Sequence, residues 1–430
     1  MRTAKTIFKN SIWLILGEII GKIAIFFLTV IVARRLGVAN FGKYNLALSF
    51  VMIFSVINDL GLNIFLFREG ARDKNLMSKY IGNIFEMRII LSVLFLGVVY
   101  IFTEVFNYPQ DIKTLIYLFA VWVCFLNLTY VYRTGFKAME AMKWDAATNV
   151  LDNILRLLIT IIVLNIGLSI FGVGMAYLMA TFIAFCFSVV LFTRFFEVPN
   201  FKIDFTLWST ALKEMRYLAL VAILIPLFGK FDSIILSHFK GNEAVGLYGA
   251  SLKLVWMLIF IPGFITQAGF PKLSQYAFQD KNRFSLLMSY LLKTNLILTF
   301  LASLIIFFFA QQIILLVYGI KYLASVKVLQ ILIWSFPLHG LIGVFIYALN
   351  ARNKQKINAL FIGIAILLNI ILAIFFTPKF SYVGVAFSTL VSLFLLCVLL
   401  FIYCSKSEYL YLKQLKFTSQ DFNMVKRIFF

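Results

Sequence analysis

Charged side chains are scarce in this chain of 430 residues, and acidic ones are the scarcest. Charged residues make up 13% of the sequence and hydrophobic residues 62%, whereas a soluble domain is about half apolar and about a quarter charged. This composition excludes a globule that hides its apolar residues behind a water-facing surface. The apolar residues form runs of about 20, the length at which a helix crosses the hydrocarbon of a bilayer. We therefore expect an all-α polytopic membrane protein.

The residue types that most often carry catalysis or bind metals are also few. The chain has two histidines, His238 and His339, and four cysteines that lie in or beside apolar runs. They do not follow the spacing of metal ligands, and no phosphate-binding loop with its lysine is present. We therefore expect no enzyme activity, no metal and no cofactor. Any pumping is expected to draw on an ion gradient rather than on ATP.

Twelve apolar segments are long enough to cross a membrane. The predicted spans are 11–33, 44–67, 81–103, 114–135, 150–168, 172–193, 216–238, 246–269, 286–309, 327–349, 357–376 and 382–404. Lys and Arg in the loops on the same side of the membrane as the N-terminus outnumber those in the opposite loops by roughly three to one. The positive-inside rule therefore places both termini in the cytoplasm. The net charge of +21 then reflects topology and attraction to anionic lipid, and we expect no nucleic-acid partner.

Two short stretches of the sequence recur. GVANFGKY at 37–44 and GNEAVGLY at 241–248 share two Gly and one Tyr at an offset of 204. A weaker echo relates FGVGMAYL at 171–178 to YVGVAFST at 382–389 at an offset of 210. These echoes predict two six-helix lobes, and because six crossings return the chain to its starting side, the repeat is parallel. The predicted domains are an N-terminal lobe at 1–205, a C-terminal lobe at 206–404 and a cytoplasmic tail at 405–430.

Several ionisable residues fall inside the predicted spans, where a charge costs roughly 2.5–3.5 kcal/mol on insertion scales and usually faces a wet or paired interior. The candidate substrate-binding cations are Lys22, Arg88, Arg156, Lys230, Lys253 and Lys293. The candidate ion-coupling carboxylates are Glu18, Asp59, Asp152 and Asp232. The cations are spread through the depth of the membrane, which suits an anionic head group that passes from one leaflet to the other.

Two of these acid–base pairs have helical spacing. Glu18 and Lys22 are four residues apart near the middle of the first span, and Asp152 and Arg156 repeat that spacing closer to the cytoplasm. Each pair shares a helix face, so it either joins helices as a salt bridge or belongs to a transport site. In the seventh span Pro226 and a nearby glycine predict a kinked or unwound helix beside Lys230 and Asp232.

Several of these segments resemble a known family. The stretch ARRLGVANFGKYNLALSF at 33–50 is similar to the first loop of the Wzx-type polysaccharide flippases, which belong to the multidrug/oligosaccharidyl-lipid/polysaccharide exporter superfamily. The resemblance continues with NDLGLN at 58–63, KFDSIILSHFKGNEAVGLYGASLKLV at 230–255 and FPKLS at 270–274, and it covers essentially the whole chain. The sequence departs from the family in having no proline shortly after Gly37.

The resemblance implies a fold and a function. The fold would be a V-shaped pair of six-helix lobes around a central cavity that opens to each side in turn. The cargo would be a polyprenyl-diphosphate-linked oligosaccharide for O-antigen or capsule biosynthesis, moved to the outer leaflet of the bacterial inner membrane. Lys230, Asp232 and Lys253 match the family's motifs, whereas Lys22 is assigned to the cavity by placement alone. The implied partners are membrane lipids and a glycan polymerase or glycosyltransferases, and the choice between proton and sodium coupling stays open.

Two other functions compete with this interpretation. A multidrug exporter of the same superfamily would share the architecture, but it predicts an acid-dominated lobe for organic cations. A membrane-embedded polysaccharide polymerase or acyltransferase would need a large outer loop or a His-based catalytic site, and the sequence has neither.

Overall fold

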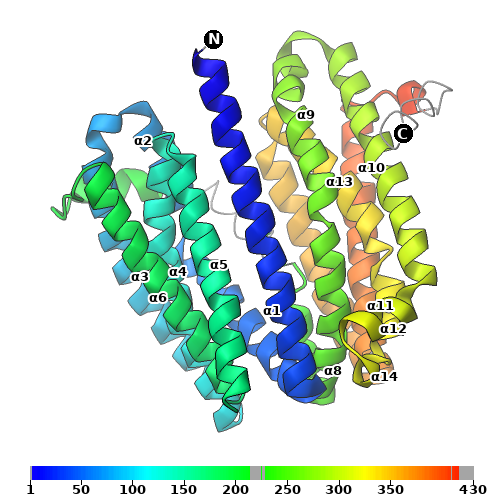
Figure 1. Cartoon of the computed structure of the whole chain (residues 1–430). Helices are drawn as coiled ribbons and strands as arrows, with labels where there is room; N and C mark the ends of the chain where they lie inside the picture. The colour runs from blue at the N-terminus through cyan, green and yellow to red at the C-terminus, as the bar shows by residue number, and fades with distance from the viewer. Residues whose placement is uncertain (1, 214–223, 225–227, 408, 416–430) are drawn as a thin grey trace. The chain divides into compact units, whose positions relative to one another are not determined.

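The computed structural model describes residues 2–213, 224, 228–407 and 409–415, and every regular element among them is helical. In the N-terminal part these are α1 (Arg2–Phe54), η1 (Ser55–Asn58), α2 (Leu62–Arg72), η2 (Lys74–Leu76), α3 (Met77–Val105), α4 (Gln110–Ala138), α5 (Met142–Asn165), α6 (Ile170–Phe195) and a helical run at 205–213. In the C-terminal part they are α8 (Lys230–Leu258), α9 (Phe260–Gln279), α10 (Lys281–Phe308), α11 (Ala310–Val317), η3 (Ile320–Tyr322), α12 (Ser325–Leu332), α13 (Ser335–Ala351), α14 (Gln355–Lys406) and η4 (Leu412–Leu415). Figure 1 shows their arrangement.

Nine helices of the described chain are long and apolar enough to cross a membrane. Three of them, Ile12–Asn58, Lys230–Gln279 and Gln355–Lys406, have 47, 50 and 52 residues. At about 1.5 Å per residue each is more than twice as long as the roughly 30 Å of bilayer hydrocarbon, so each is longer than one crossing needs. Each is also interrupted, at Gly37, Gly241 and Ser381, by a residue with positive φ. These helices contain eleven of the twelve predicted crossings in full or in large part, and residues 230–238 of the seventh form the start of α8.

The chain divides into two compact units, residues 1–234 and 235–430. In the N-terminal unit α4 packs against α1, α3, α5 and α6, and α1 also packs along α5. In the C-terminal unit α13 packs against α9, α10 and α14. The predicted domain limits at residues 205 and 404 stay predictions. Pro226 and eleven of the 23 residues of the seventh predicted span lie outside the described residues, as does the tail after residue 415.

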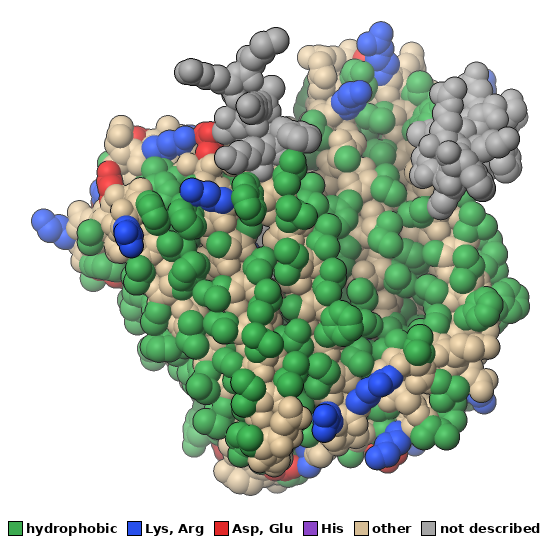
Figure 2. Space-filling model, viewed as in Figure 1, with side chains coloured by type: hydrophobic (Ala, Val, Ile, Leu, Met, Phe, Trp, Pro, Cys, Tyr) green, Lys and Arg blue, Asp and Glu red, His purple; other side chains and the backbone are tan. Residues whose placement is uncertain are grey.

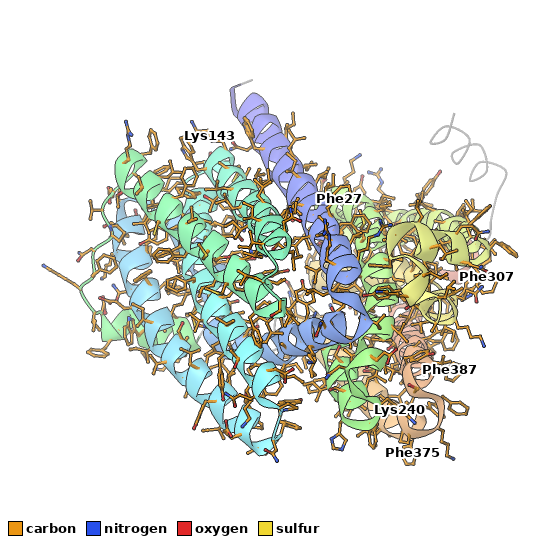
Figure 3. The ribbon with its side chains drawn as sticks, turned by 60° about the horizontal axis from the view of Figure 1, so that its bottom comes forward. Phe27, Lys143, Lys240, Phe307, Phe375 and Phe387 are labelled. Carbon is orange, nitrogen blue, oxygen red and sulfur yellow. The ribbon has the colours of Figure 1, made fainter. Side chains whose placement is uncertain are left out.

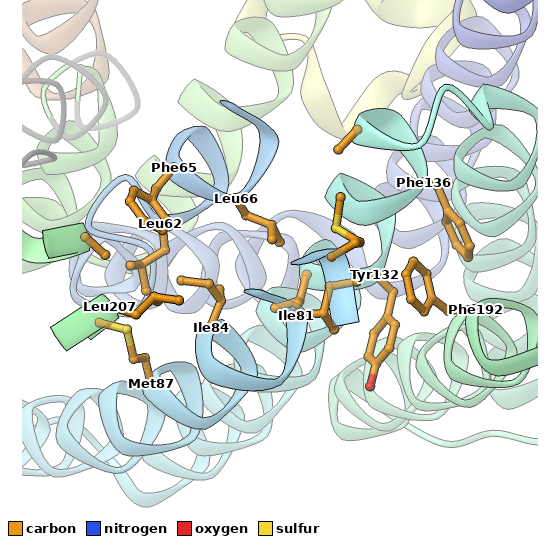
Figure 4. Close-up of a cluster of buried hydrophobic side chains, with 14 of the residues drawn as sticks. Leu62, Phe65, Leu66, Ile81, Ile84, Met87, Tyr132, Phe136, Phe192 and Leu207 are labelled. Atoms are coloured by element: carbon orange, nitrogen blue, oxygen red, sulfur yellow. The ribbon is translucent and has the colours of Figure 1, made fainter. Parts of the chain in front are cut away.

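A hydrophobic cluster joins α2, α3, α4 and α6 at one end of the N-terminal unit. Leu66, Ile81, Ile84 and Phe136 are fully buried in it, and Figure 4 shows Leu207, from the helical run that follows α6, beside Ile84. Burial of such side chains contributes about 1.5–3 kcal/mol each relative to leaving them exposed. The segment after α6 is thus part of the core of this unit.

The connection from α6 to residue 205 is fastened to the start of α3. The amide of Asn200 donates to the carbonyl of Ser78 at 3.0 Å, and the amide of Asp204 donates to the Asn83 side chain at 2.7 Å. A Cβ on Gly82 would lie 1.9 Å from the carbonyl oxygen of Asn200, so only glycine admits this close approach. The connection therefore has a fixed path over the N-terminal unit.

The outer surface of the helices is mostly apolar. Figure 2 shows hydrophobic side chains along the helices and Lys and Arg near their ends. In Figure 3 Phe375 and Phe387 project away from the two segments of α14, and their side chains are 70% and 48% exposed. Exposed aromatic and aliphatic side chains along such helices are suited to hydrocarbon rather than water, which agrees with a multi-pass membrane protein.

Candidate functional site

A polar pocket of about 280 Å³ lies inside the N-terminal unit. Its walls are α1, α4 and α5, and it is lined by Glu18, Gly21, Lys22, Ile25, Trp122, Leu126, Tyr130, Arg133, Lys137, Asn149, Asp152, Asn153 and Arg156. Four of these side chains are basic and two are acidic. Charged groups inside membrane helices are expensive and usually mark a site, so this pocket is the candidate functional site.

Close packing between α1 and α5 forms one wall of the pocket. Gly17 and Gly21 lie four residues apart on α1, and a Cβ on either would come within 2.9 Å of α5, at Ala146 and Asn153 respectively. The side-chain amide of Asn149 donates to the carbonyl of Gly17 at 3.1 Å. Small residues at this spacing let membrane helices approach closely and hydrogen-bond to each other. This contact turns Glu18 and Lys22 toward the pocket.

Arg156 is held at one end of the pocket by a buried network. Its guanidinium pairs with Asp152 and lies 5.1 Å from the ring centre of Trp122 and 4.7 Å from that of Tyr177. The hydroxyl of Thr181 donates to Asp152 at 2.7 Å and accepts from the indole of Trp122 at 2.9 Å. Ion pairing, hydrogen bonding and cation–π contacts together fix the position of this cation.

A second cation, Arg133, is held at the other end. Its Nε donates to Asp145 at 2.7 Å, and the ammonium of Lys137 lies 3.5 Å from the same carboxylate. Arg133 and Asp145 are both buried, with 6% and 2% of their surface exposed. Asp145 therefore joins two basic residues of α4 to the first turn of α5.

The pocket runs along the helices rather than across them. Lys137 is one residue from the end of α4 and Trp122 is sixteen, a separation of about 22 Å along the axis at 1.5 Å per residue. Arg156 lies fourteen residues into α5, at the depth of Trp122, which it contacts. Basic groups thus line a path that begins at the α4–α5 turn, on the side predicted to be cytoplasmic, and reaches past the midpoint of α5.

Four of the ten predicted site residues meet in this pocket: Glu18, Lys22, Asp152 and Arg156. Both pairs keep the helical spacing seen in the sequence. The Glu18 and Lys22 side chains lie 3.6 Å apart and are 46% and 29% exposed. The two predicted i,i+4 pairs, which were separate observations in the sequence, therefore belong to one site.

Arg88 and Asp59 lie elsewhere in the N-terminal unit. The Arg88 guanidinium is fully buried, 2.5 Å from the Asp59 carboxylate and 3.3 Å from the side-chain oxygen of Asn127. Asp59 ends a 3₁₀ turn, and the next two residues, Leu60 and Gly61, have φ of 43° and 83°. The pair therefore stabilises a break in the second predicted span.

The other predicted residues do not line this pocket. Lys230 and Asp232 lie in the first turn of α8, and Asp232 is fully buried. Lys253 lies farther along α8, and Lys293 lines a different pocket in the C-terminal unit.

Sequence reasoning missed Arg133, Lys137, Asn149 and Asn153 as parts of the site. A signal for Arg133 was present, because it falls within the predicted span 114–135 and shares a helix face with Trp122 and Tyr130 at spacings of eleven and three residues. Asn149 and Asn153 have the same i,i+4 spacing as the charged pairs.

Two family models match the chain. Residues 7–277 match the family described as "Polysaccharide biosynthesis protein", and residues 235–425 match the family described as "Lipid II flippase MurJ". A curated protein of Shigella flexneri, described as "Putative O-antigen transporter", is 23% identical over 404 residues, which cover 89% of this chain and 94% of that protein.

Solved structures of membrane transporters have a similar fold. A structure of lipid II flippase MurJ in an inward closed conformation superposes with a TM-score of 0.76 at 17% identity, covering 98% of this chain and 96% of that one. A multidrug resistance MATE family transporter of the MOP superfamily, in an inward-facing conformation, gives a TM-score of 0.76 at 12% identity and covers 90% and 94%. The likeness extends over nearly all of each chain, so the chain has the fold of these transporters.

Proposed function

This chain belongs to the polysaccharide biosynthesis protein family, and from that premise we propose that it is a flippase for a polyprenyl-diphosphate-linked oligosaccharide. It would carry the glycan of O-antigen or capsule biosynthesis from the cytoplasmic to the outer leaflet of the bacterial inner membrane, with both termini in the cytoplasm. The step is a translocation by alternating access and breaks no covalent bond. The curated relative's description as an O-antigen transporter supports this cargo.

The observation that carries the proposal is the excess of basic groups in the pocket of the N-terminal unit. Lys22, Arg133, Lys137 and Arg156 line it together with two carboxylates. Charge-assisted hydrogen bonds to phosphate are stronger than neutral ones, and Arg binds phosphate oxygens in a bidentate manner. A diphosphate brings the negative charge that this pocket lacks.

The depth of the pocket supports translocation rather than binding at the surface. A head group that enters at the α4–α5 turn meets Lys137 and Arg133 first, then Lys22, and Arg156 last. Successive contacts of this kind lower the cost of moving an anion into the membrane, because each position offers a new opposite charge. Lys253 stays a proposed contact for the later part of the path.

Glu18 is the best-supported coupling carboxylate of the four predicted. Asp59 and Asp152 are held by buried arginines. Neutralisation of either carboxylate during coupling would leave a buried arginine without its counter-charge, which is costly. Glu18 is 3.6 Å from Lys22 and nearly half exposed. We propose that a proton or a sodium ion neutralises Glu18, so that Lys22 is released to the anionic substrate.

The rival functions fit less well. A multidrug exporter for organic cations would place those cations against four basic side chains in this pocket, where like charges repel. A polymerase or acyltransferase is not the activity that the matched families describe. A polymerase and glycosyltransferases are instead proposed as partners that supply or use the lipid-linked glycan.

The test reconstitutes the purified chain in liposomes with a fluorescent polyprenyl-diphosphate glycan and follows its protection from a membrane-impermeant quencher. We expect wild type to flip the lipid and the double variant Lys22→Gln with Lys137→Gln to flip it at least ten-fold more slowly, because two charge-assisted contacts of about 1.5–3 kcal/mol each are lost. Both side chains are partly exposed, so their loss leaves folding largely intact.

Lys143→Gln is the matched control. Lys143 is an exposed residue in the first turn of α5, and it does not line the pocket; Figure 3 labels it at the end of that helix. Its loss removes the same charge near the same turn and should leave the rate unchanged. If wild type leaves several such glycolipids in place but exports an organic cation under an ion gradient, the multidrug function replaces the one proposed.

A further inference from the structure

A second pocket lies within the C-terminal unit, between α10, α13 and α14. It has a volume of about 360 Å³ and is lined by Leu292, Lys293, Leu296, Leu341, Phe345, Cys397, Val398 and Phe401. The volume is more than twice that of the ~150 Å³ apolar cavity that binds benzene. The walls of an unfilled apolar space lose dispersion contacts, so hydrocarbon is the chemistry that fits it.

The one charged residue in its wall, Lys293, is 8% exposed. It follows Arg88 of α3 by 205 residues, which is one more than the offset of the repeat, and it lies on α10. In the N-terminal unit Arg88 is locked between Asp59 and Asn127. Each unit thus buries a basic side chain in a membrane helix, and in the C-terminal unit this side chain borders an apolar pocket.

The depth of Lys293 restricts what the pocket can hold. Lys293 is twelve residues into α10, which is about 18 Å along a helix that rises 1.5 Å per residue. Since α10 has 28 residues, about 42 Å at this rise, Lys293 lies near its midpoint, and a helix centred on a hydrocarbon layer about 30 Å thick has its midpoint near the middle of the membrane. A phospholipid that stays in one leaflet keeps its phosphate near the interface, whereas a lipid in transit brings an anion to this depth.

We propose that this pocket holds the isoprenoid chain next to the diphosphate while the head group of the lipid-linked substrate crosses the membrane, with Lys293 attracting the diphosphate. The proposal rests on the proposed function and adds a second subsite to it. The basic pocket of the N-terminal unit would hold the head group near the start of the path. The apolar pocket would distinguish lipid-linked glycans from water-soluble ones that carry the same diphosphate.

The experiment uses the full chain in proteoliposomes and a polyprenyl diphosphate with a diazirine on the isoprene unit nearest the phosphate. After irradiation, labelled residues are mapped by mass spectrometry and flipping is measured on the same preparation. We expect labels on α10, α13 and α14 at the pocket. Leu341→Trp and Val398→Phe fill the pocket and should each lower labelling and flipping at least five-fold. Lys293→Gln should lower both several-fold.

Leu301→Trp is the matched control, because Leu301 lies on α10, is 47% exposed and does not line the pocket. This variant should be labelled as strongly as wild type and should flip the lipid at the same rate. Size-exclusion profiles identify a variant that fails to fold. If Leu341→Trp does not fold, the result for Val398→Phe decides the outcome.

Each other outcome overturns the proposal in a distinguishable way. If wild type flips the lipid but the filled variants are labelled as strongly as wild type, this subsite is wrong and the flippase function stands. If a phosphatidylglycerol with the same diazirine labels the same residues equally well, the pocket holds ordinary bilayer lipid. If wild type flips no lipid-linked glycan, the proposed function is wrong and the subsite fails with it.

Discussion

Gly37 and Gly241 adopt the same backbone conformation, with φ of 75° and 77° and ψ of 176° and −177°. They are 204 residues apart, the offset at which the sequence repeats. The helices that contain them end at the same offset, α1 at Phe54 and α8 at Leu258. Equal interruptions followed by equal lengths of helix indicate that each unit was built from the same six-helix plan.

The tyrosine seven residues after each glycine makes an equivalent contact. The hydroxyl of Tyr44 lies 2.5 Å from that of Tyr177 on α6, and the hydroxyl of Tyr248 lies 3.2 Å from that of Thr389 in the second segment of α14. Both tyrosines are buried. In each unit the helix after the interruption is thus tied to the last crossing of that unit by a buried hydroxyl pair.

Replacement of either glycine by alanine should destabilise the protein. Their φ and ψ lie in a region that is essentially restricted to glycine, and occupation by another residue costs about 1–3 kcal/mol. Because a Cβ at either position meets nothing within 4 Å, the cost comes from the backbone alone. We expect Gly37→Ala and Gly241→Ala each to lower the thermal unfolding midpoint in detergent.

Gly97→Ala is the control for this prediction. Gly97 lies inside α3, and a Cβ there also meets nothing within 4 Å. Since its backbone is helical, alanine should be neutral or stabilising by up to about 1 kcal/mol. Equal midpoints for all three variants would show that the interruptions carry no strain.

The sequence predicted the crossings and the repeat because both depend on local patterns. Apolar runs and a Gly-x₄-Gly-x-Tyr match are visible without tertiary structure. The break at Leu60 and Gly61 was not predicted, because the apolar run continues across it. It depends on the contact between Asp59 and Arg88, whose partners are 29 residues apart, and a helix pattern holds no information on such a pairing.

The site was predicted in part for a similar reason. Glu18 with Lys22 and Asp152 with Arg156 are pairs within single helices, which helical spacing reveals. Their meeting in one pocket depends on the rotation of α1 against α5, which is set by Gly17 and Gly21. Arg133 was missed because a basic residue near the end of a span is equally well explained by a side chain that reaches the interface.

Acid should release the connection between α6 and residue 205. The ammonium of Lys79 lies 2.6 Å from the Asp204 carboxylate and, with the amides of Leu207 and Thr206, holds the pKa of Asp204 below its ordinary value of 3.8. Because this pKa is lowered in the folded state, the stabilisation is present above about pH 4 and is lost as the pH falls through the folded value. Hydrogen-exchange protection of the Asn200 and Asp204 amides should therefore decrease below pH 4.

The variant Asp204→Asn separates this effect from general acid unfolding. It should show reduced protection of the same two amides at neutral pH and no further selective loss in acid. Because the pair is exposed, high salt should also weaken it in wild type. Protection that is insensitive to both the variant and acid would mean that the backbone contacts to Ser78 and Asn83 hold this segment without the ion pair.

Loss of Asp145 should be more damaging than loss of both partners together. Asp145→Asn leaves Arg133 buried without its counter-charge, and breaking a buried pair in this way costs about 3–5 kcal/mol. Arg133→Gln with Asp145→Asn removes both charges and should recover a large part of the thermal stability. A double-mutant cycle on unfolding midpoints measures the coupling, and additive effects of the two substitutions would show that the pair contributes no net interaction.

The recovered double variant also separates stability from transport. Arg133 lines the pocket and Asp145 lies behind it, so the double variant should fold well and yet flip the lipid-linked glycan several-fold more slowly than wild type. Recovery of flipping together with stability would show that Arg133 serves packing alone.

Glu18→Gln should separate transport from its driving force. Neutralising this carboxylate leaves Lys22 without its neighbour at 3.6 Å, so an anionic head group binds more tightly. We expect a several-fold lower apparent KM for the glycolipid and a flipping rate that no longer responds to an imposed proton or sodium gradient. Glu18→Asp keeps the charge on a shorter side chain and should retain the response to one of the two gradients, which identifies the coupling ion. If Glu18→Gln still responds to the same gradient as wild type, the coupling group lies elsewhere, and the buried Asp232 of α8 becomes the residue to test.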